Sequence, residues 1–244
     1  MRHLEIDRAG GRARLERVPT GWLVDVVGAA DADAATDLLG AALDAIAVQG
    51  GGLARHWVRA DDPATTEASR RLGLVEERRL CQLRRSLPVD APWDLDVRPF
   101  VVGEDEDAWL AVNNRAFAWH PEQGGWTRAE LEDRMAEPWF DPAGFLLHEV
   151  DGRLVGFCWT KAHRSERPPL GEIFVIGVDP EAGVRGLGRP LTLAGLDHLH
   201  RVDGMPVGML YVDGDNDAGE RLYDKLGFEV HHVDTSFTTT VAAP

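Results

Sequence analysis

The chain has 244 residues, of which 44% are hydrophobic and 27% charged, enough for one large globular domain or two small ones. Its 26 Lys and Arg against 41 Asp and Glu give a formal net charge of −15, which disfavours binding to nucleic acid or an anionic membrane surface. No apolar run approaches the roughly 20 residues of a membrane helix, and the first residues lack the apolar core of a secretory signal. We expect a cytoplasmic protein in which Cys81 and Cys158 are thiols, although the sequence leaves one bridge between them open.

The first 90 residues follow the order β-β-β-α-β-α-β. Alternating apolar residues indicate the strands, and an Ala-rich stretch indicates the first helix. The expected strands are Leu4–Ile6, Arg12–Val18, Trp22–Val27, Leu53–Val58 and Val75–Leu87, and the expected helices are Ala34–Val48 and Ala64–Leu72. The stretch Leu87–Asp94, with Pro88 and Pro92, is typical of a linker.

The rest of the chain follows a longer order, β-α-α-β-β-β-α-β-α-β-β. The dipeptide Asp151-Gly152 is a strong signal for a hairpin. The expected strands are Leu95–Arg98, Gly144–Val150, Leu154–Lys161, Glu172–Val178, Leu210–Val212, Phe228–Val233 and Ser236–Val241. The expected helices are Asp105–Phe117, Thr127–Glu137, Arg189–Arg201 and Asp217–Leu226.

The two halves match at one spacing. Leu72-Gly73-Leu74 and Leu226-Gly227-Phe228 lie 154 positions apart (residues 73 and 227), and the same spacing places Trp57-Val58 on Tyr211-Val212. Because the order of elements agrees as well, we expect an internal repeat, with chance similarity as the alternative. The expected domains are an incomplete, degenerate N-terminal repeat at 1–88, a linker at 89–94 and a complete C-terminal repeat at 95–244.

A glycine-rich turn joins a buried strand to a helix at residues 176–189, IGVDPEAGVRGLGR. Gly186 and Gly188 let the backbone approach a ligand closely. The helix that follows presents free N–H groups and the positive end of its dipole, and Arg185 and Arg189 add positive charge. The turn therefore predicts a local pyrophosphate site in a chain that is acidic overall.

This turn, followed by Tyr211, Asp215-Asn216 and the run Tyr223–Phe228, resembles the GCN5-related N-acetyltransferase (GNAT) superfamily over Leu95–Val241. The resemblance implies an α/β (α+β) tandem GNAT fold, with mixed, mostly antiparallel sheets flanked by helices, a truncated first repeat, acetyl-CoA as acetyl donor and no metal. It also implies the residues that line coenzyme A, which are Ile176, Gly177, Val178, Gly183, Val184, Arg185, Gly186, Leu187, Gly188, Arg189, Asn216, Asp217, Ala218, Gly219, Glu220 and Arg221. The superfamily usually has Gln or Arg at the position of Gly183, so we expect one side-chain contact to the cofactor to be missing.

Amide formation requires a neutral amine, so a base must remove a proton from the ammonium form. Glu172 precedes the apolar stretch Ile173–Ile176 and is the expected base, directly or through water. Tyr223 is the expected acid for the leaving thiolate. The backbone N–H groups of Ile176–Val178 are expected to polarise the thioester carbonyl. The structural alternatives are a solvent-facing carboxylate for Glu172 and a half-buried core residue for Tyr223.

Within the superfamily, three stretches are similar to the tandem mycothiol synthases (mycothiol acetyltransferases): NNRAFAWHPEQGGW at Asn113–Trp126, WTKAH at Trp159–His163 and GEIFVIGVDP at Gly171–Pro180. This resemblance implies acetylation of the cysteinyl amine of cysteinyl-glucosaminyl-inositol to form mycothiol. The residues implied to contact this small-molecule acceptor are Glu122, Lys161, Glu172 and Tyr211. We expect a monomer that binds neither nucleic acid nor membrane.

The first repeat lacks the corresponding chemistry. At the spacing of 154, Ser69 stands at the position of Tyr223, and the glycine turn maps to Ala29–Ala34, where two aspartates would repel phosphate. We therefore expect no acetyl-CoA there. Two other functions remain open: acetyl transfer to another small amine or peptide, and non-catalytic binding of acetyl-CoA or a scaffold role. The pairs His198/His200 and His231/His232 lack the spacing of metal ligands, so we expect no metal site.

Overall fold

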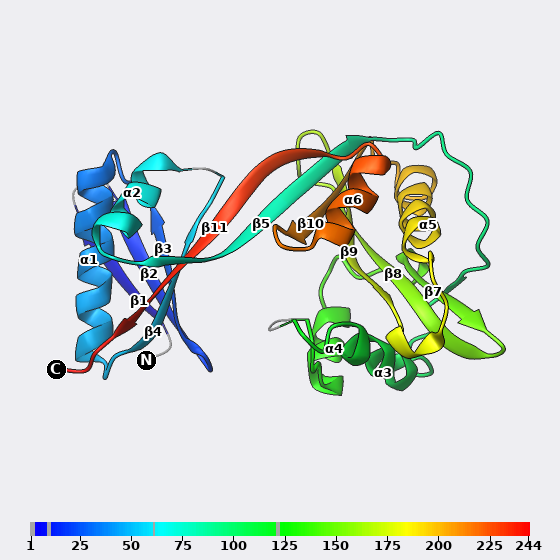
Figure 1. Ribbon diagram of the computed structural model, residues 1–244, viewed down its shortest axis with the longest axis horizontal. Helices are drawn as coiled ribbons and strands as arrows, with labels where there is room; N and C mark the ends of the chain where they lie inside the picture. Colours follow the sequence, from blue (N-terminus) through cyan, green and yellow to red (C-terminus); the bar gives the residue numbers. More distant parts are fainter. Residues whose placement is uncertain (1–2, 9–10, 61, 121–122) are drawn as a thin grey trace. The chain divides into compact units, whose positions relative to one another are not determined.

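The computed structural model describes residues 3–8, 11–60, 62–120 and 123–244 (Figure 1). The strands are β1 (His3–Arg8), β2 (Gly11–Val18), β3 (Gly21–Val27), β4 (Gly52–Val58), β5 (Val75–Ser86), β6 (Arg98–Pro99), β7 (Phe145–Val150), β8 (Arg153–His163), β9 (Leu170–Val178), β10 (Val207–Asp213) and β11 (Glu229–Val241). The α-helices are α1 (Ala32–Val48), α2 (Pro63–Arg71), α3 (Glu106–Ala116), α4 (Arg128–Met135), α5 (Gly188–Arg201) and α6 (Asp217–Lys225), with short 3-10 helices η1 (Pro142–Gly144) and η2 (Pro180–Ala182). None of the described helices is both long and apolar enough to span a bilayer.

The chain forms two compact units. The first contains Met1–Gln82, Val212–Asp217 and Val230–Pro244, and the second contains Leu83–Tyr211 and Ala218–Glu229. Neither unit is therefore continuous in sequence, because two segments near the C-terminus, Val212–Asp217 and Val230–Pro244, belong to the first unit. The domains expected from the sequence, 1–88 and 95–244 joined by the linker 89–94, describe the two repeats and not these compact units. That division therefore stays a prediction.

The first unit is a sheet covered on one face by α1. Its strand order includes β1-β2-β3-β4-β11, in which β3 and β4 are parallel and the other neighbouring strands are antiparallel. Leu38, Leu39 and Ile46 of α1 are fully buried against the sheet, beside Leu15 and Trp22. Each such side chain contributes about 1.5–3 kcal/mol through apolar burial, so this packing holds α1 on the sheet (Figure 1).

The second unit carries helices on both faces of its sheet. The order β10-β9-β8-β7-β6 is antiparallel except for the parallel pair β9 and β10. Phe157 and Trp159 of β8 pack in a core with Trp109 of α3, at ring-centroid distances of 5.3 and 5.8 Å. On the other face, an added Cβ at Gly195 of α5 would lie 2.5 Å from Cys158 Sγ, so only glycine permits this close approach. Both cysteines are buried thiols.

Most of the expected elements are present with small shifts at their ends, but the strand expected at Leu95–Arg98 is wrong, because only Arg98 and Pro99 pair with β7 to form β6. The hairpin at Asp151-Gly152 is confirmed, because both residues have positive φ (52° and 74°) and join β7 to β8. The separate strands expected at Phe228–Val233 and Ser236–Val241 are wrong, since both lie in the single strand β11. Asp234 does not break the strand because its carboxylate accepts the backbone N–H of Ala60 at 2.8 Å.

The repeat is visible in how two helices end. α2 and α6 begin and end at residues 154 positions apart (63 and 217, 71 and 225). Gly73 and Gly227 follow these helices with φ of 73° and 75°. The N–H groups of Leu74 and Phe228 donate to the carbonyls of Ser69 and Tyr223 at 2.9 and 3.0 Å. Both helices thus end in the same left-handed glycine cap, which supports the internal repeat.

Candidate active site

A buried carboxylate fixes the start of the glycine-rich turn after β9. Asp179 is 1% exposed and accepts Arg115 Nε and Nη2 at 3.0 and 2.8 Å and Arg153 Nη2 at 2.8 Å. It also accepts the N–H of Glu181 in η2 at 3.0 Å. The hydrogen bonds from Arg115, above all, lower the pKa of Asp179 from 3.8 to about 2. Sequence reasoning did not give Asp179 this role, because Arg115 lies on α3, far away in the chain.

The turn itself is exposed and shaped by glycine. Gly183 and Gly186 have φ of 66° and 83°, where residues with a Cβ are disfavoured. An added Cβ at Gly183 would meet no described atom within 4 Å, so its backbone conformation rather than space favours glycine. The Gln or Arg that is usual in the superfamily is thus replaced by glycine at a position where the backbone has a left-handed conformation.

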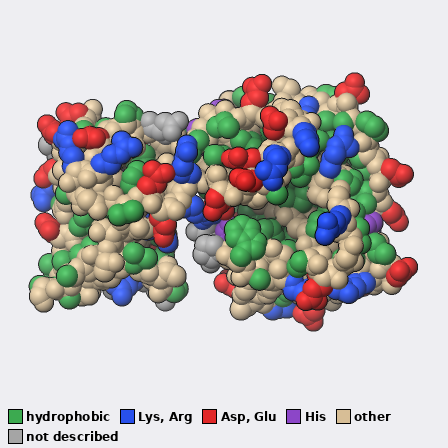
Figure 2. Space-filling model, viewed as in Figure 1, with side chains coloured by type: hydrophobic (Ala, Val, Ile, Leu, Met, Phe, Trp, Pro, Cys, Tyr) green, Lys and Arg blue, Asp and Glu red, His purple; other side chains and the backbone are tan. Residues whose placement is uncertain are grey.

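The first turn of α5 begins without a side-chain cap. Its N-cap residue, Leu187, makes no side-chain cap hydrogen bond, so no side-chain cap competes for the first N–H groups. Arg185 is exposed and makes no hydrogen bond or ion pair with any residue that the structure describes. Arg189 Nη1 donates to the carbonyl of Pro92 at 3.4 Å. Figure 2 shows basic side chains interspersed with acidic ones on the face in view.

Strands β9 and β10 separate beside this turn. Their parallel pairing covers Leu170–Ile173 and Val207–Leu210, whereas β9 continues to Val178. The segment with the predicted carbonyl-polarising groups, Ile176–Val178, lies in this continuation and pairs on its other edge with β8. A Cβ at Gly177 would approach Phe157 to 2.9 Å, so glycine lets the strand pack closely there. The predicted carbonyl-polarising segment therefore lies in the part of β9 beyond its pairing with β10, next to the glycine-rich turn.

The expected base lies among polar and aromatic side chains on β8 and β9. Glu172 is 7% exposed, and its register partner across the two strands is Lys161. His163 Nε2 lies 2.6 Å from Glu172 Oε2. Lys161 Nζ lies over the rings of Trp139 and Phe174, 4.5 and 5.4 Å from their centroids. Glu172 is therefore a buried, hydrogen-bonded carboxylate rather than a solvent-facing one.

His163 was missed by sequence reasoning, although it ends the quoted stretch WTKAH. The hairpin register supplies the signal, because His163 pairs with Leu170 and Lys161 with Glu172. Lys161 and His163 are two residues apart on β8, and Glu172 lies opposite Lys161 on β9. The three side chains therefore share one face of the sheet.

The expected acid is a buried phenol. Tyr223 on α6 packs edge-on against Phe228, with ring centroids 5.7 Å apart. Burial, with a smaller contribution from the nearby Cys158 thiol, raises the pKa of Tyr223 to about 12. The group therefore keeps its proton at neutral pH, as a general acid must.

The remaining predicted residues are distributed as follows. Leu222 Cδ2 lies 3.4 Å from the position of an added Cβ at Gly188, so α6 passes beside the first turn of α5. The predicted cofactor residues Ala218, Gly219, Glu220 and Arg221 lie on α6 in the second unit, and Tyr211 is 41% exposed at the end of that unit's β10 segment. Asn216 and Asp217 belong to the first unit, and Glu122 lies outside the described residues.

The sequence is similar to characterised families over this site. Residues 109–228 match the acetyltransferase (GNAT) family. A mycothiol acetyltransferase of Streptomyces griseus subsp. griseus is 50% identical over 207 residues, which cover 82% of this chain and 66% of the relative. One from Thermobispora bispora is 46% identical over 241 residues, which cover 95% of this chain and 80% of the relative. The chain belongs to the mycothiol acetyltransferase family.

Solved structures support the same fold. A GCN5-related N-acetyltransferase from Sphaerobacter thermophilus superposes with a TM-score of 0.75 at 20% identity, covering 96% of this chain and 77% of that one. The expected GNAT fold is thereby confirmed. The chain spans 66% of the length of the Streptomyces griseus relative.

The first unit provides an internal comparison with this family's site. Leu23 pairs with Arg55 in the parallel ladder of β3 and β4, as Glu172 pairs with Met209 in that of β9 and β10. Arg55 and Met209 lie 154 positions apart, so Leu23 is the counterpart of the expected base. At the start of α1, the Asp31 carboxylate accepts the N–H of Ala34 at 2.9 Å. The first unit therefore has an apolar residue in place of the base and its own carboxylate at the helix N-terminus.

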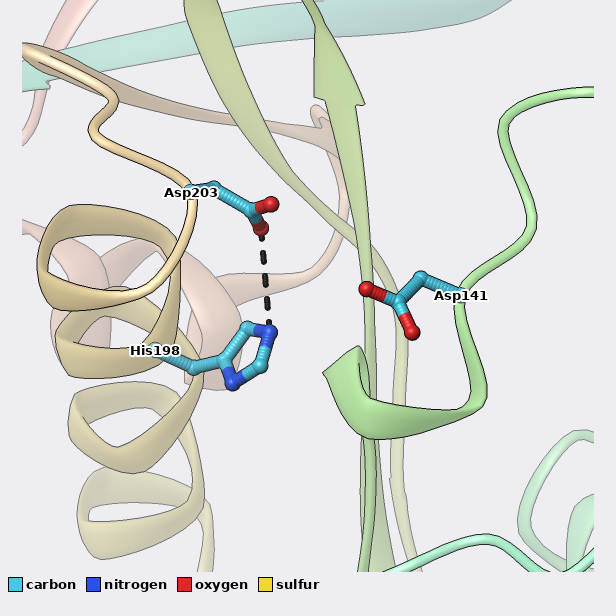
Figure 3. A group of neighbouring side chains, drawn as sticks. All are labelled: Asp141, His198 and Asp203. Carbon is cyan, nitrogen blue, oxygen red and sulfur yellow. Dashed lines mark ion pairs between the residues drawn. The ribbon is translucent and has the colours of Figure 1, made fainter.

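A separate polar cluster in the second unit offers metal-type ligand atoms. Asp141, His198 and Asp203 each place one such atom within 4.8 Å of the others (Figure 3). They come from three segments, so spacing along the sequence could not reveal them. Asp203 already accepts Arg164 Nη2 at 2.7 Å, and Asp141 accepts the N–H of Ala143 at 2.9 Å. Arg164 thus supplies positive charge to Asp203, whereas His198 Nε2 lies 3.7 Å from Asp203 Oδ2 and makes no hydrogen bond with any residue that the structure describes.

Proposed function

We propose that the protein transfers the acetyl group of acetyl-CoA to the cysteinyl amine of cysteinyl-glucosaminyl-inositol, forming mycothiol. The observation that carries this proposal is the buried, hydrogen-bonded Glu172 on β9, the strand that leads to the uncapped turn of α5. The names of the related proteins, mycothiol acetyltransferases, support this acceptor over other amines. Acetyl transfer to another small amine is the second candidate, because the family matched by residues 109–228 is named for acetyl transfer and not for an acceptor.

The proposed reaction begins with the acceptor amine. Its ammonium form loses a proton to Glu172, and the neutral nitrogen attacks the thioester carbonyl carbon of acetyl-CoA. Negative charge then develops on the carbonyl oxygen, which the backbone N–H groups of Ile176–Val178 stabilise by hydrogen bonding. Holding both reactants beside β9 supplies part of the rate through positioning.

The tetrahedral intermediate then collapses. The nitrogen releases its second proton to solvent, and the carbon–sulfur bond breaks as Tyr223 donates its phenolic proton to the leaving sulfur, so that the products are the neutral amide and coenzyme A. The raised pKa of Tyr223 ensures that the proton is present when this step occurs. A proton passes from Glu172 back to Tyr223 through solvent before the next turnover.

The cofactor would bind at the turn before α5 and not at the corresponding turn before α1. Gly183–Arg189 would hold its pyrophosphate, with Arg185 as the available cation. The Asp31 cap at the corresponding helix of the first unit supports this assignment, because a carboxylate already accepts an N–H group there. We expect calorimetry to give one acetyl-CoA per chain, and two would contradict the assignment.

The activity is tested with purified protein, acetyl-CoA and cysteinyl-glucosaminyl-inositol. Glu172→Gln removes the base but keeps the size of the side chain, and we expect kcat to fall about 10²- to 10⁴-fold. Tyr223→Phe removes only the hydroxyl, and we expect a loss of roughly 10²-fold. Activity on a different amine but not on this acceptor would favour the second candidate. Unchanged turnover in both variants would rule out the mechanism.

A further inference from the structure

A histidine outside the proposed machinery contacts the proposed base. The 2.6 Å contact between His163 Nε2 and Glu172 Oε2 joins the end of β8 to the start of β9. We propose that His163 is a positioning residue that holds Glu172 in the orientation needed to accept the amine proton. This inference rests on the proposed function of Glu172 as the base.

The proposed role of Glu172 defines which group donates in this contact. A base must be ionised and can only accept, so in the proposed active form Nε2 of His163 carries the hydrogen. The bond occupies Oε2 and leaves Oε1 of Glu172 as the oxygen that can accept from the substrate amine. A glutamate side chain has three rotatable torsions, and anchoring one oxygen reduces the orientations that it samples.

The two partners differ in their exposure. The His163 side chain is 25% exposed, whereas that of Glu172 is 9% exposed. The hydrogen bond therefore joins a partly exposed histidine to a nearly buried carboxylate. In such surroundings a hydrogen bond orients its acceptor more strongly than it does in bulk water.

The other nearby cations have different partners. Lys161 stands opposite Glu172 in the register, but its ammonium group lies over Trp139 and Phe174. Arg164, the next residue along the chain, pairs with Asp203 at 2.7 Å. Of these three residues, His163 is the one whose hydrogen bond goes to Glu172.

Two substitutions separate positioning from a general structural role. His163→Ala removes the donor, and we expect kcat to fall roughly 10- to 100-fold while the KM for acetyl-CoA is unchanged, since the cofactor turn is not altered. His163→Gln retains an amide N–H near the position of Nε2, and we expect it to recover kcat to within a few fold of the original protein. His200→Gln is the matched control, because the ring of His200 faces the carbonyl of Met205 instead, and its kcat should not change.

A double substitution then tests whether His163 acts through Glu172. We expect His163→Ala to have no further effect on kcat when Glu172 is already Gln, because there is no carboxylate left to orient. An equal loss in both backgrounds, or no rescue by Gln in a variant that folds with the original thermal midpoint, would overturn the proposal. If Glu172→Gln alone left turnover unchanged, the proposed base itself would be wrong, and that result is distinct from the failure of His163.

Discussion

Replacing Asp179 with Asn tests how the cofactor turn is held. The side chain of Asp179 is fully buried, while those of its partners Arg115 and Arg153 are 31% and 56% exposed. Lowering the pKa of Asp179 from 3.8 to about 2 corresponds to about 2–3 kcal/mol of stabilisation. Solvent screening of the two arginines reduces this to about 2 kcal/mol. For a chain of this size we therefore expect Asp179→Asn to lower the thermal midpoint by about 4–8 °C at pH 7.

The pH dependence of the effect has a definite sign. The carboxylate stabilises the folded state only when ionised, so its contribution is present above the ordinary pKa of 3.8 and is lost as pH falls towards 2. Thermal unfolding of the two proteins should differ by a constant amount from pH 8 to 5, and the difference should narrow below pH 4. Arg153→Gln is the control, because this more exposed partner should contribute about 1 kcal/mol or less. The reasoning is refuted if Asp179→Asn unfolds at the original temperature at pH 7, or if Arg153→Gln costs more.

Two further outcomes follow from the packing and from the buried phenol. Gly195→Ala should destabilise the protein by about 1–3 kcal/mol, because the added Cβ would overlap Cys158 Sγ. The control is Gly40→Ala in α1, which should be neutral or stabilising because the nearest atom to the added Cβ is 4.0 Å away. Equal thermal midpoints for the two variants would contradict the packing described. Because the pKa of Tyr223 is raised to about 12, its proton should remain through pH 10, so the original protein and Tyr223→Phe should show the same shape of kcat against pH between pH 7 and 10. A decline near pH 10 that only the original protein shows would count against the assignment.

Local patterns predicted the elements, whereas contacts between distant residues decided the details. Asp151-Gly152 and the glycine turn were recognisable because backbone conformation there depends on nearby residues. The continuity of β11 was not recognisable, because the Asp234 carboxylate accepts a hydrogen bond from the backbone N–H of Ala60, 174 positions earlier. His163 became visible only through the hairpin register. Gly183 was interpreted as a lost side chain, and its φ of 66° supplies a backbone reason for glycine.

The C-terminal strand has a consequence for how the two repeats are inherited. Residues Thr235–Val241 of β11 pair with Gly52–Val58 of β4 inside the first unit. A chain ending at the predicted linker would leave β4 with an unpaired edge open to association with other molecules. A chain beginning there would carry the buried Phe237 and Ser236 without their sheet. Although the halves have the signature of a duplication, this strand means that division of the gene at the linker would not give two proteins that each carry a complete sheet.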